Sequence, residues 1–417
     1  MSSIVIEGGK KLTGEIKVGG AKNSAVALIP AAILSNGEVE FDNVPNISDV
    51  YALEEILNSL GVDVEYKDHK LKMNSKNMVN AVIPCELSSK LRASYYFMGA
   101  LLGKYKTVKM CFPGGCSIGE RPINLHLKGF EKLGATVIEE DGSFTITAKK
   151  LIGDEIFLDV PSVGATINIV LAAVLAKGKT VIDNAATEPH VVDVCEFLNK
   201  MGAKITGIGT PKIEIIGVKK LAPTKHSVIP DQIESGTYVI IASLLGRNLK
   251  VSGLVPGHLE SLTSKLIEAG VKLDIGKDYI NVKKTHSYKA IDIKTVVYPG
   301  FPTDLQQTII PFLTQCRGIS HVEETIYENR FMNIPDTNKM GANIEVIDNK
   351  YAIIRGKSKL VGKKVEATDL RGGASMVICG LIAKGTTTIT NISHILRGYE
   401  NIIEKLTKVG ANIKITD

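Results

Sequence analysis

The sequence of 417 residues lacks several features that mark whole classes of protein. No apolar run is as long as a membrane span, and Met1 to Val5 lacks the basic and apolar regions of a signal peptide. The six cysteines form no CxxC pair, and the eight histidines are scattered singly. These absences argue against a disulfide framework, a structural zinc site and a resident metal, and no cofactor is expected. We therefore expect a cytoplasmic protein.

Arginine is scarce, since most of the 50 basic residues are lysines. The net charge of +6 suits an anionic small molecule better than a nucleic acid, which would require clustered basic residues. Five arginines stand in motif-like segments: Arg92, Arg121, Arg330, Arg371 and Arg397. Because a guanidinium group binds phosphate or carboxylate through a fork of donors, these arginines are candidate ligands of an anionic substrate.

A pattern of about 70 residues recurs six times, a longer period than that of ordinary solenoids. In each copy an apolar helix, a strand and an amphipathic helix are followed by a glycine and another strand. The glycines are Gly61, Gly134, Gly202, Gly270, Gly341 and Gly410. Glycine is a common helix stop, and the alternating residues after it are typical of a half-buried strand.

The first helix of each copy is apolar on nearly all sides, which predicts that it is buried. These helices are expected to begin near Gly20, Arg92, Gly164, Gly236, Pro302 and Gly373. The second helices, such as 50–60 and 399–409, are amphipathic and should lie outside. We predict two α/β domains of three repeats each, with helices inside and sheets around them. The proline-bracketed segment 223–230 is the expected boundary, and a cleft between the domains is the expected ligand site.

One glycine-rich turn, 113–122, carries Cys116 five residues before Arg121. A positive charge near a thiol lowers its pKa and favours the reactive thiolate. An unremarkable tight turn would explain the same local composition, because free cysteine is usually buried and inert. Three other cysteines, Cys195, Cys316 and Cys379, lie in apolar runs and are expected to serve packing.

Several strings occur together: GAKNSA at 20–25, PGGC at 113–116, PGFPTDLQ at 299–306, ENRF at 328–331 and RGYE at 397–400. With them the chain resembles, over essentially its whole length, the UDP-N-acetylglucosamine enolpyruvyl transferases (1-carboxyvinyltransferases). The resemblance implies a two-domain inside-out α/β barrel of six repeats. Its domains would be 21–229, and 1–20 with 230–417, with the active site in the cleft between them.

The resemblance also implies a reaction. The enolpyruvyl group of phosphoenolpyruvate would pass to the 3-hydroxyl of UDP-N-acetylglucosamine through a tetrahedral intermediate, with release of phosphate, as the first committed step of peptidoglycan synthesis. Such chemistry needs an acid, a base and an anion clamp. Cys116 matches the family's proton donor, which also forms a covalent adduct and reacts with the epoxide fosfomycin. Asp304 matches the carboxylate that deprotonates or orients the hydroxyl, although from the residues alone it could equally be a helix N-cap.

The other matching residues have implied binding roles. Lys22, Arg92, Arg121 and Arg397 would hold phosphoenolpyruvate, with Arg330 and Arg371 as further candidates for that clamp. Asn23 would position the sugar hydroxyl. The remaining substrate-binding positions are Pro122, Ile123, Asn124 and Leu125 for the nucleotide sugar, Ser162, Val163 and Gly164 for its diphosphate, and Ile326 and Asp369. No metal ligand and no obligate protein, nucleic-acid or membrane partner is implied.

Three positions depart from the family pattern. Asn124 and Leu396 stand where acidic residues are common, and Val160 stands where some members have a lysine. Two alternatives stay open: a 5-enolpyruvylshikimate-3-phosphate synthase, and a catalytically silent anion- or nucleotide-binding protein on the same scaffold. The GAKNSA string and Cys116 favour the sugar nucleotide over shikimate 3-phosphate.

Overall fold

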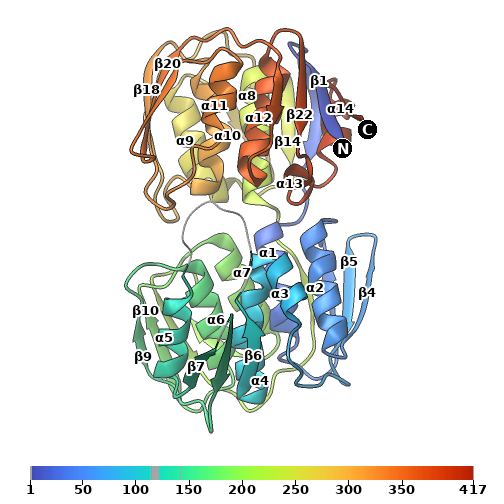
Figure 1. Ribbon diagram of the computed structural model, residues 1–417, viewed down its shortest axis with the longest axis vertical. Coiled ribbons are helices and arrows are strands. Elements are labelled where there is room, and N and C mark those ends of the chain that lie inside the picture. Colours follow the sequence, from blue (N-terminus) through green and yellow to red (C-terminus); the bar gives the residue numbers. More distant parts are fainter. Residues whose placement is uncertain (1, 113, 115–121, 141, 417) are drawn as a thin grey trace. The chain divides into compact units, whose positions relative to one another are not determined.

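The computed structural model describes residues 2–112, 114, 122–140 and 142–416. Within these residues the chain forms two compact units, each with its own hydrophobic core. One unit, which we call the C-unit, contains residues 2–19 and 230–416. The other, the N-unit, contains the described residues between 20 and 229 (Figure 1).

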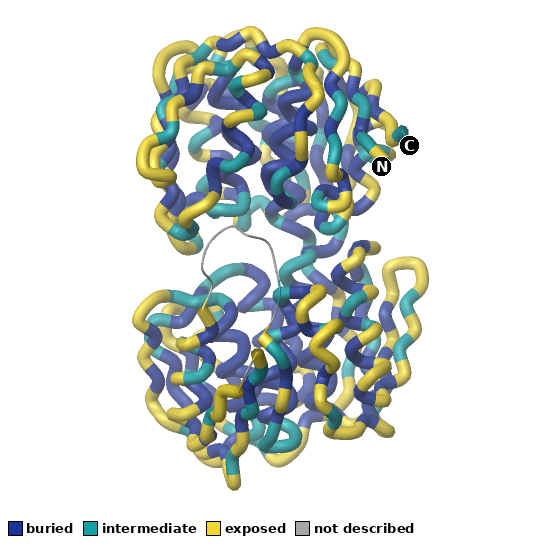
Figure 2. Tube along the Cα trace, viewed as in Figure 1, coloured by how far each residue is buried: buried dark blue, intermediate teal, exposed yellow. Residues whose placement is uncertain are grey.

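The first helix of each repeat is buried, as its composition predicts (Figure 2). In α6, every residue from Gly164 to Ala173 is buried. These inner helices are α1 (Lys22–Ala32), α4 (Tyr96–Tyr105) and α6 (Val163–Ala173) in the N-unit, and α8 (Gln232–Leu245), α10 (Thr303–Leu313) and α12 (Leu370–Ile382) in the C-unit. Within each unit the inner helices pack against one another, so that the core is a set of helices surrounded by sheets.

The second helices are amphipathic and bury one face, which also agrees with the sequence. They are α2 (Ser48–Ser59), α5 (Asn124–Lys132), α7 (Pro189–Lys200), α9 (Glu260–Glu268), α11 (Ile334–Lys339) and α14 (Ile402–Lys408). Shorter helical segments are α3 (Cys85–Lys90), α13 (Ser393–Leu396) and the 3₁₀ turns η1 (Arg92–Tyr95) and η2 (Pro256–Leu259). The six predicted glycine stops follow the second helices with φ between 76° and 107°, a region that favours glycine.

Six small sheets surround the helices in the described part of the chain. The N-unit sheets have the orders β13 (Lys225–Ser227), β3 (Glu38–Asp42), β5 (Lys70–Asn74), β4 (Asp63–Lys67); β6 (Thr107–Cys111), β8 (Ser143–Thr147), β7 (Thr136–Glu140); and β11 (Lys204–Thr206), β12 (Lys212–Ile216), β10 (Lys179–Asp183), β9 (Glu155–Phe157). The sheets mix directions: β10 is antiparallel to β12 and parallel to β9.

The sheets of the C-unit recruit the first two strands of the chain. Their orders are β15 (Lys272–Ile275), β16 (Tyr279–Lys283), β14 (Gly246–Ser252), β2 (Leu12–Lys17); β17 (Ile293–Lys294), β18 (Gly318–Glu323), β20 (Tyr351–Gly356), β19 (Ile344–Ile347); and β21 (Lys364–Glu366), β22 (Thr386–Thr390), β1 (Ser3–Glu7), β23 (Asn412–Thr416). β1 lies between β22 and β23, with Ile4 opposite Ile389 and Ile415. This pairing fastens the N-terminus to the last repeat.

Two inner helices begin earlier than the sequence predicts. α8 starts at Gln232 rather than near Gly236, and α12 starts at Leu370 rather than near Gly373. The physical reason is the same in both, because Asp231 and Asp369 each accept two backbone N–H bonds as helix N-caps. In the second repeat, the 3₁₀ turn at Arg92 precedes the α-helix, which begins at Tyr96.

The segment 223–230 contains regular secondary structure and is not an irregular linker throughout. Lys225–Ser227 forms strand β13, parallel to β3, and the chain passes from one unit to the other after Ile229. Its strand pairing ties most of this segment to the N-unit. In the described residues, no helix combines the length and apolar character that a membrane span needs.

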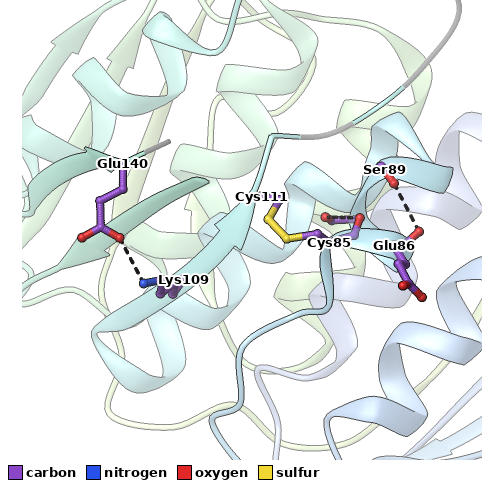
Figure 3. Close-up of a disulfide and its surroundings, with 7 residues drawn as sticks. Cys85, Glu86, Ser89, Lys109, Cys111 and Glu140 are labelled. Atoms are coloured by element: carbon purple, nitrogen blue, oxygen red, sulfur yellow. Dashed lines mark hydrogen bonds and ion pairs between the residues drawn. A yellow bond between two sulfur atoms is a disulfide. The ribbon is translucent and has the colours of Figure 1, made fainter. Parts of the chain in front are cut away.

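Cys195, Cys316 and Cys379 are free and buried, as predicted. The structure also joins Cys85 and Cys111 in a disulfide, with Cα atoms 5.2 Å apart, which corrects the expectation drawn from spacing (Figure 3). The pairing follows from tertiary structure, because Ile83 forms a parallel bridge with Met110 and brings the start of α3 beside the end of β6. A single bridge of this kind leaves no local signal in the sequence.

Candidate active site

Asp304 stands at the centre of a charged cluster in the C-unit. It lies in the first turn of α10, and its two carboxylate oxygens accept from different guanidinium groups. Arg330 Nη2 is 2.7 Å from Oδ1, and Arg371 Nη2 is 3.0 Å from Oδ2. The side chains of the two arginines are only 3% and 4% exposed, whereas that of Asp304 is 26% exposed. Asp304 is therefore the member of the cluster that solvent, or a substrate, can reach.

The two arginines decide the protonation state of Asp304. Burial favours the neutral carboxyl, but the charges and hydrogen bonds of Arg371 and Arg330 outweigh it and hold the pKa of Asp304 well below its usual range. The interpretation of Asp304 as a helix N-cap was wrong: α10 has Pro302 at that position and no side-chain cap. The structure instead makes Asp304 an ionised acceptor with its oxygens fixed in direction.

Asp369 and Gln307 form hydrogen bonds with Arg371 and Arg330, respectively, and with each other. Asp369 Oδ1 accepts the backbone N–H groups of Arg371 and Gly372, while Oδ2 accepts from Gln307 Nε2 at 2.9 Å. Gln307 is fully buried, and its Oε1 lies 3.4 Å from Arg330 Nη1. Both oxygens of Asp369, a candidate ligand from the sequence, are thus engaged in capping α12 and fixing Gln307.

Glu324 holds the segment that carries Ile326. Its Oε2 accepts from the Thr303 hydroxyl at 2.9 Å, and its Oε1 accepts from the N–H of Ile326 at 2.8 Å. Because Thr303 directly precedes Asp304, one buried carboxylate links the Ile326 turn to the start of α10. Arg330 follows Ile326 by four residues, and its Cζ lies 5.0 Å from the centroid of the Tyr327 ring. Glu324 was not identified from the sequence.

Lys22 opens α1 in the N-unit, one residue before Asn23. Its Nζ lies 2.8 Å from Asp49 Oδ2, and the two side chains are 14% and 4% exposed. A lysine at the first turn of a helix adds its charge to the N–H groups that already favour an anion there. Asp49, on α2, holds the lysine in this direction and had no distinguishing motif in the sequence.

A second cluster surrounds the amino end of α6, the predicted diphosphate segment. Ser162 caps the helix by accepting from the Ala165 N–H at 3.3 Å. Tyr95 and His126 flank Gly164, and Arg92 Cζ lies 5.8 Å from the centroid of the Tyr95 ring. The structure therefore places Tyr95 and His126 against Gly164, with Arg92 beside the Tyr95 ring.

The remaining predicted positions fall on the ends of helices or beyond the described residues. Pro122 is exposed, Ile123 is buried, and Asn124 and Leu125 begin α5. Arg397 follows α13 directly and is half-buried, and the departing residues Val160 and Leu396 are 56% and 38% exposed. Cys116 and Arg121 lie outside the described residues. The strand that leads toward them, β6, ends at the disulfide-bonded Cys111.

Comparison with known proteins extends over the whole chain. The model of the EPSP synthase (3-phosphoshikimate 1-carboxyvinyltransferase) family matches residues 6–406. A relative from Geobacillus kaustophilus, UDP-N-acetylglucosamine 1-carboxyvinyltransferase 2, is 50% identical over 420 residues, covering 100% of this chain and 98% of its own. The protein of the same name from Listeria innocua is 49% identical, covering 99% of this chain and 97% of its own.

Solved structures agree on the fold. The enolpyruvyl transferase NikO from Streptomyces tendae superposes with a TM-score of 0.90 at 26% identity, covering 100% of this chain and 99% of that one. An EPSP synthase from Acinetobacter baumannii, at 19% identity and full coverage of both chains, has a TM-score of 0.77 and shares the architecture. Together with the six repeats and the charged clusters, these matches establish that the chain belongs to the EPSP synthase family of enolpyruvyl transferases.

Proposed function

We propose that this enzyme transfers the enolpyruvyl group of phosphoenolpyruvate to the 3-hydroxyl of UDP-N-acetylglucosamine and releases phosphate. The observation that carries the proposal is the identity of about one half, over the full length, to proteins named for this activity. The product would be the first committed intermediate of peptidoglycan synthesis. Both substrates are soluble metabolites, which suits a cytoplasmic enzyme.

The Asp304 cluster supports a role for this carboxylate at the sugar hydroxyl. An ionised carboxylate oxygen with a fixed direction can accept a hydrogen bond from the sugar hydroxyl. This bond would orient the hydroxyl so that a lone pair of its oxygen points at the enol carbon. With both guanidinium groups bound, the carboxylate is a weak base. We propose that Arg330 and Arg371 share their charge with the anionic substrate as it binds, which raises the basicity of Asp304 when the proton must leave.

The addition step needs an acid and an anion clamp. We propose that Cys116 protonates the methylene carbon as the sugar oxygen bonds to the adjacent carbon, giving a tetrahedral intermediate. Loss of a proton from the new methyl group together with phosphate then restores the carbon–carbon double bond of the enolpyruvyl group. Lys22, Arg92, Arg121 and Arg397 would bind the phosphate and carboxylate, since fixed cations stabilise the charge that develops. Lys22 and Arg92 belong to the N-unit, and Arg397 belongs to the C-unit. No metal or cofactor is needed for this balance of atoms.

A phosphate-release assay tests the proposal directly. With phosphoenolpyruvate present, UDP-N-acetylglucosamine should support phosphate release and shikimate 3-phosphate should not. Mass spectrometry of the sugar nucleotide should show the added enolpyruvyl group. Turnover with shikimate 3-phosphate alone would favour the sister synthase, and turnover with neither acceptor would favour a silent binding protein.

A further inference from the structure

Tyr399, in the RGYE string, is a fully buried aromatic residue, 1% exposed, that contacts two inner helices of the C-unit. Cζ of Arg371, on α12, lies over its ring, 5.4 Å from the centroid. Its hydroxyl oxygen lies 3.0 Å from Oγ1 of Thr237, on α8. Because the Thr237 hydroxyl donates to the carbonyl oxygen of Ile233 at 2.8 Å, it accepts the bond from Tyr399. The hydroxyl thus anchors the ring to α8, and the ring supports Arg371 on α12.

Arg371 depends on this ring for the direction of its guanidinium plane. Its Nη2 donates to Oδ2 of Asp304 at 3.0 Å, whereas its buried Nε has no hydrogen-bond partner in the part of the chain that the structure describes. A planar guanidinium held at one nitrogen can still turn about that bond. An aromatic face within about 6 Å attracts the cation and opposes such a turn, most strongly where both groups are desolvated. The Tyr399 ring therefore fixes the direction in which Arg371 presents Nη2 to Asp304.

The turn that carries Tyr399 also carries Arg397, two residues earlier. A Cβ atom at Gly398 would lie 2.7 Å from Cδ1 of Leu370, so the backbone of this turn lies directly against the first residue of α12. Helix α13, which ends just before Arg397, also packs against α12 (Figure 1). One turn of the chain thus bears both a candidate anion ligand, Arg397, and the ring that supports Arg371.

We propose that Tyr399 is a positioning residue that fixes Arg371, and through it the carboxylate of Asp304, relative to Arg397. The inference rests on the proposed function, which assigns Asp304 to the sugar hydroxyl and Arg397 to phosphoenolpyruvate. Because a small misplacement of reacting groups slows a reaction without removing the substrates, loss of the ring should lower kcat rather than the affinity for the nucleotide. Tyr399 acts from its buried place, through Arg371.

Three variants separate the ring, its hydroxyl and general packing. Y399F keeps the ring and removes the hydroxyl, and Y399L removes the ring. Y288L is the matched control in the same unit. The Tyr288 ring packs 4.9 Å from that of Phe312, near the carboxyl end of α10, and its hydroxyl donates to the carbonyl oxygen of Ser243 on α8. Phosphate release at saturating substrates gives kcat, calorimetry gives the affinity for UDP, and urea unfolding gives stability.

Y399L should lower kcat roughly 10–100-fold and leave the affinity for UDP unchanged. Y399F should stay close to wild type in kcat, because the ring still lies under the guanidinium. Y288L should unfold at a lower urea concentration and keep its kcat. A normal kcat in Y399L would overturn the proposal, and so would an equal loss of kcat in Y288L or in Y399F. If Y399L does not fold, Y399M, which fills the space with a flexible side chain and has no ring, decides the question against Y288M.

A double-mutant cycle tests whether Tyr399 acts through Arg371. R371K keeps the charge but lacks the planar group that stacks on the ring. In the R371K background, Y399L should change kcat by no more than about twofold, because the group that the ring fixes is already gone. The same loss of kcat in both backgrounds would show that Tyr399 acts independently of Arg371 and would overturn the proposal. Failure of the wild type to release phosphate with UDP-N-acetylglucosamine would instead overturn the proposed function, and this inference with it.

Discussion

Replacing Asp304 by asparagine keeps the shape of the side chain and removes its charge. Arg330 and Arg371, whose side chains are 3% and 4% exposed, would then be buried cations without the carboxylate that pairs with both of them. Removing one partner of a buried ion pair costs about 3–5 kcal/mol. Because the Asp304 side chain is 26% exposed, solvent screens part of the interaction, and we expect about 2–4 kcal/mol.

Catalysis should suffer separately from stability in D304N. Loss of the group that orients and accepts from the hydroxyl should lower kcat by roughly 10²–10⁴-fold at saturating substrates. The binding of UDP should change little, because the Asp304 cluster and the α6 cluster have no residue in common. Phosphate release under saturation measures the first effect, and urea unfolding measures the second.

A matched control lies in the same unit. Asp292 pairs with His321 at 2.9 Å, but its side chain is 69% exposed, so D292N should change unfolding by less than about 0.5 kcal/mol and leave turnover intact. If D304N retains normal kcat, the carboxylate does not act on the hydroxyl. If D304N unfolds at the same urea concentration as the wild type, the buried arginines do not depend on it, and the electrostatic reasoning is refuted.

Three further predictions follow from the same structure and sequence. Because the folded-state pKa of Asp304 is depressed, its contribution to stability is present above the unfolded pKa of about 3.9 and is lost at lower pH. The difference in unfolding free energy between wild type and D304N, measured by urea titration, should therefore be constant from pH 5 to 8 and shrink below pH 4. A difference that is largest in acid would contradict this sign. C116S should abolish or severely reduce phosphate release and prevent inactivation by fosfomycin; full activity with unchanged inactivation would remove Cys116 from the mechanism. G164A should cost about 1–3 kcal/mol and weaken UDP, because the new Cβ meets His126 and Tyr95, whereas G257A, with open space around its Cβ, should do neither; equal behaviour of the two variants in unfolding and calorimetry would argue against the crowding at Gly164.

The repeat architecture was accessible from the sequence because its signals are local. A helix that is apolar on all sides must be buried, and a glycine with positive φ stops a helix wherever it occurs, so the six glycines from Gly61 to Gly410 marked the repeats without any knowledge of packing. The exact helix starts were less accessible. Asp231 and Asp369 cap helices that begin before their glycines, and a capping aspartate looks like any other polar residue until its N–H partners are known.

The candidate site divides in the same way. Asp304 and Lys22 stood in recognisable strings, and their places in motif-like segments singled out Arg330 and Arg371 among the few arginines. The residues that orient them did not, because Glu324 and Asp49 act through contacts between elements far apart in the sequence. Local sequence shows which chemistry a residue carries. Only tertiary structure could decide that Asp304 is an ion held by two buried arginines rather than a helix cap, and that Cys85 meets Cys111, since each depends on which distant group lies within hydrogen-bonding or bonding reach.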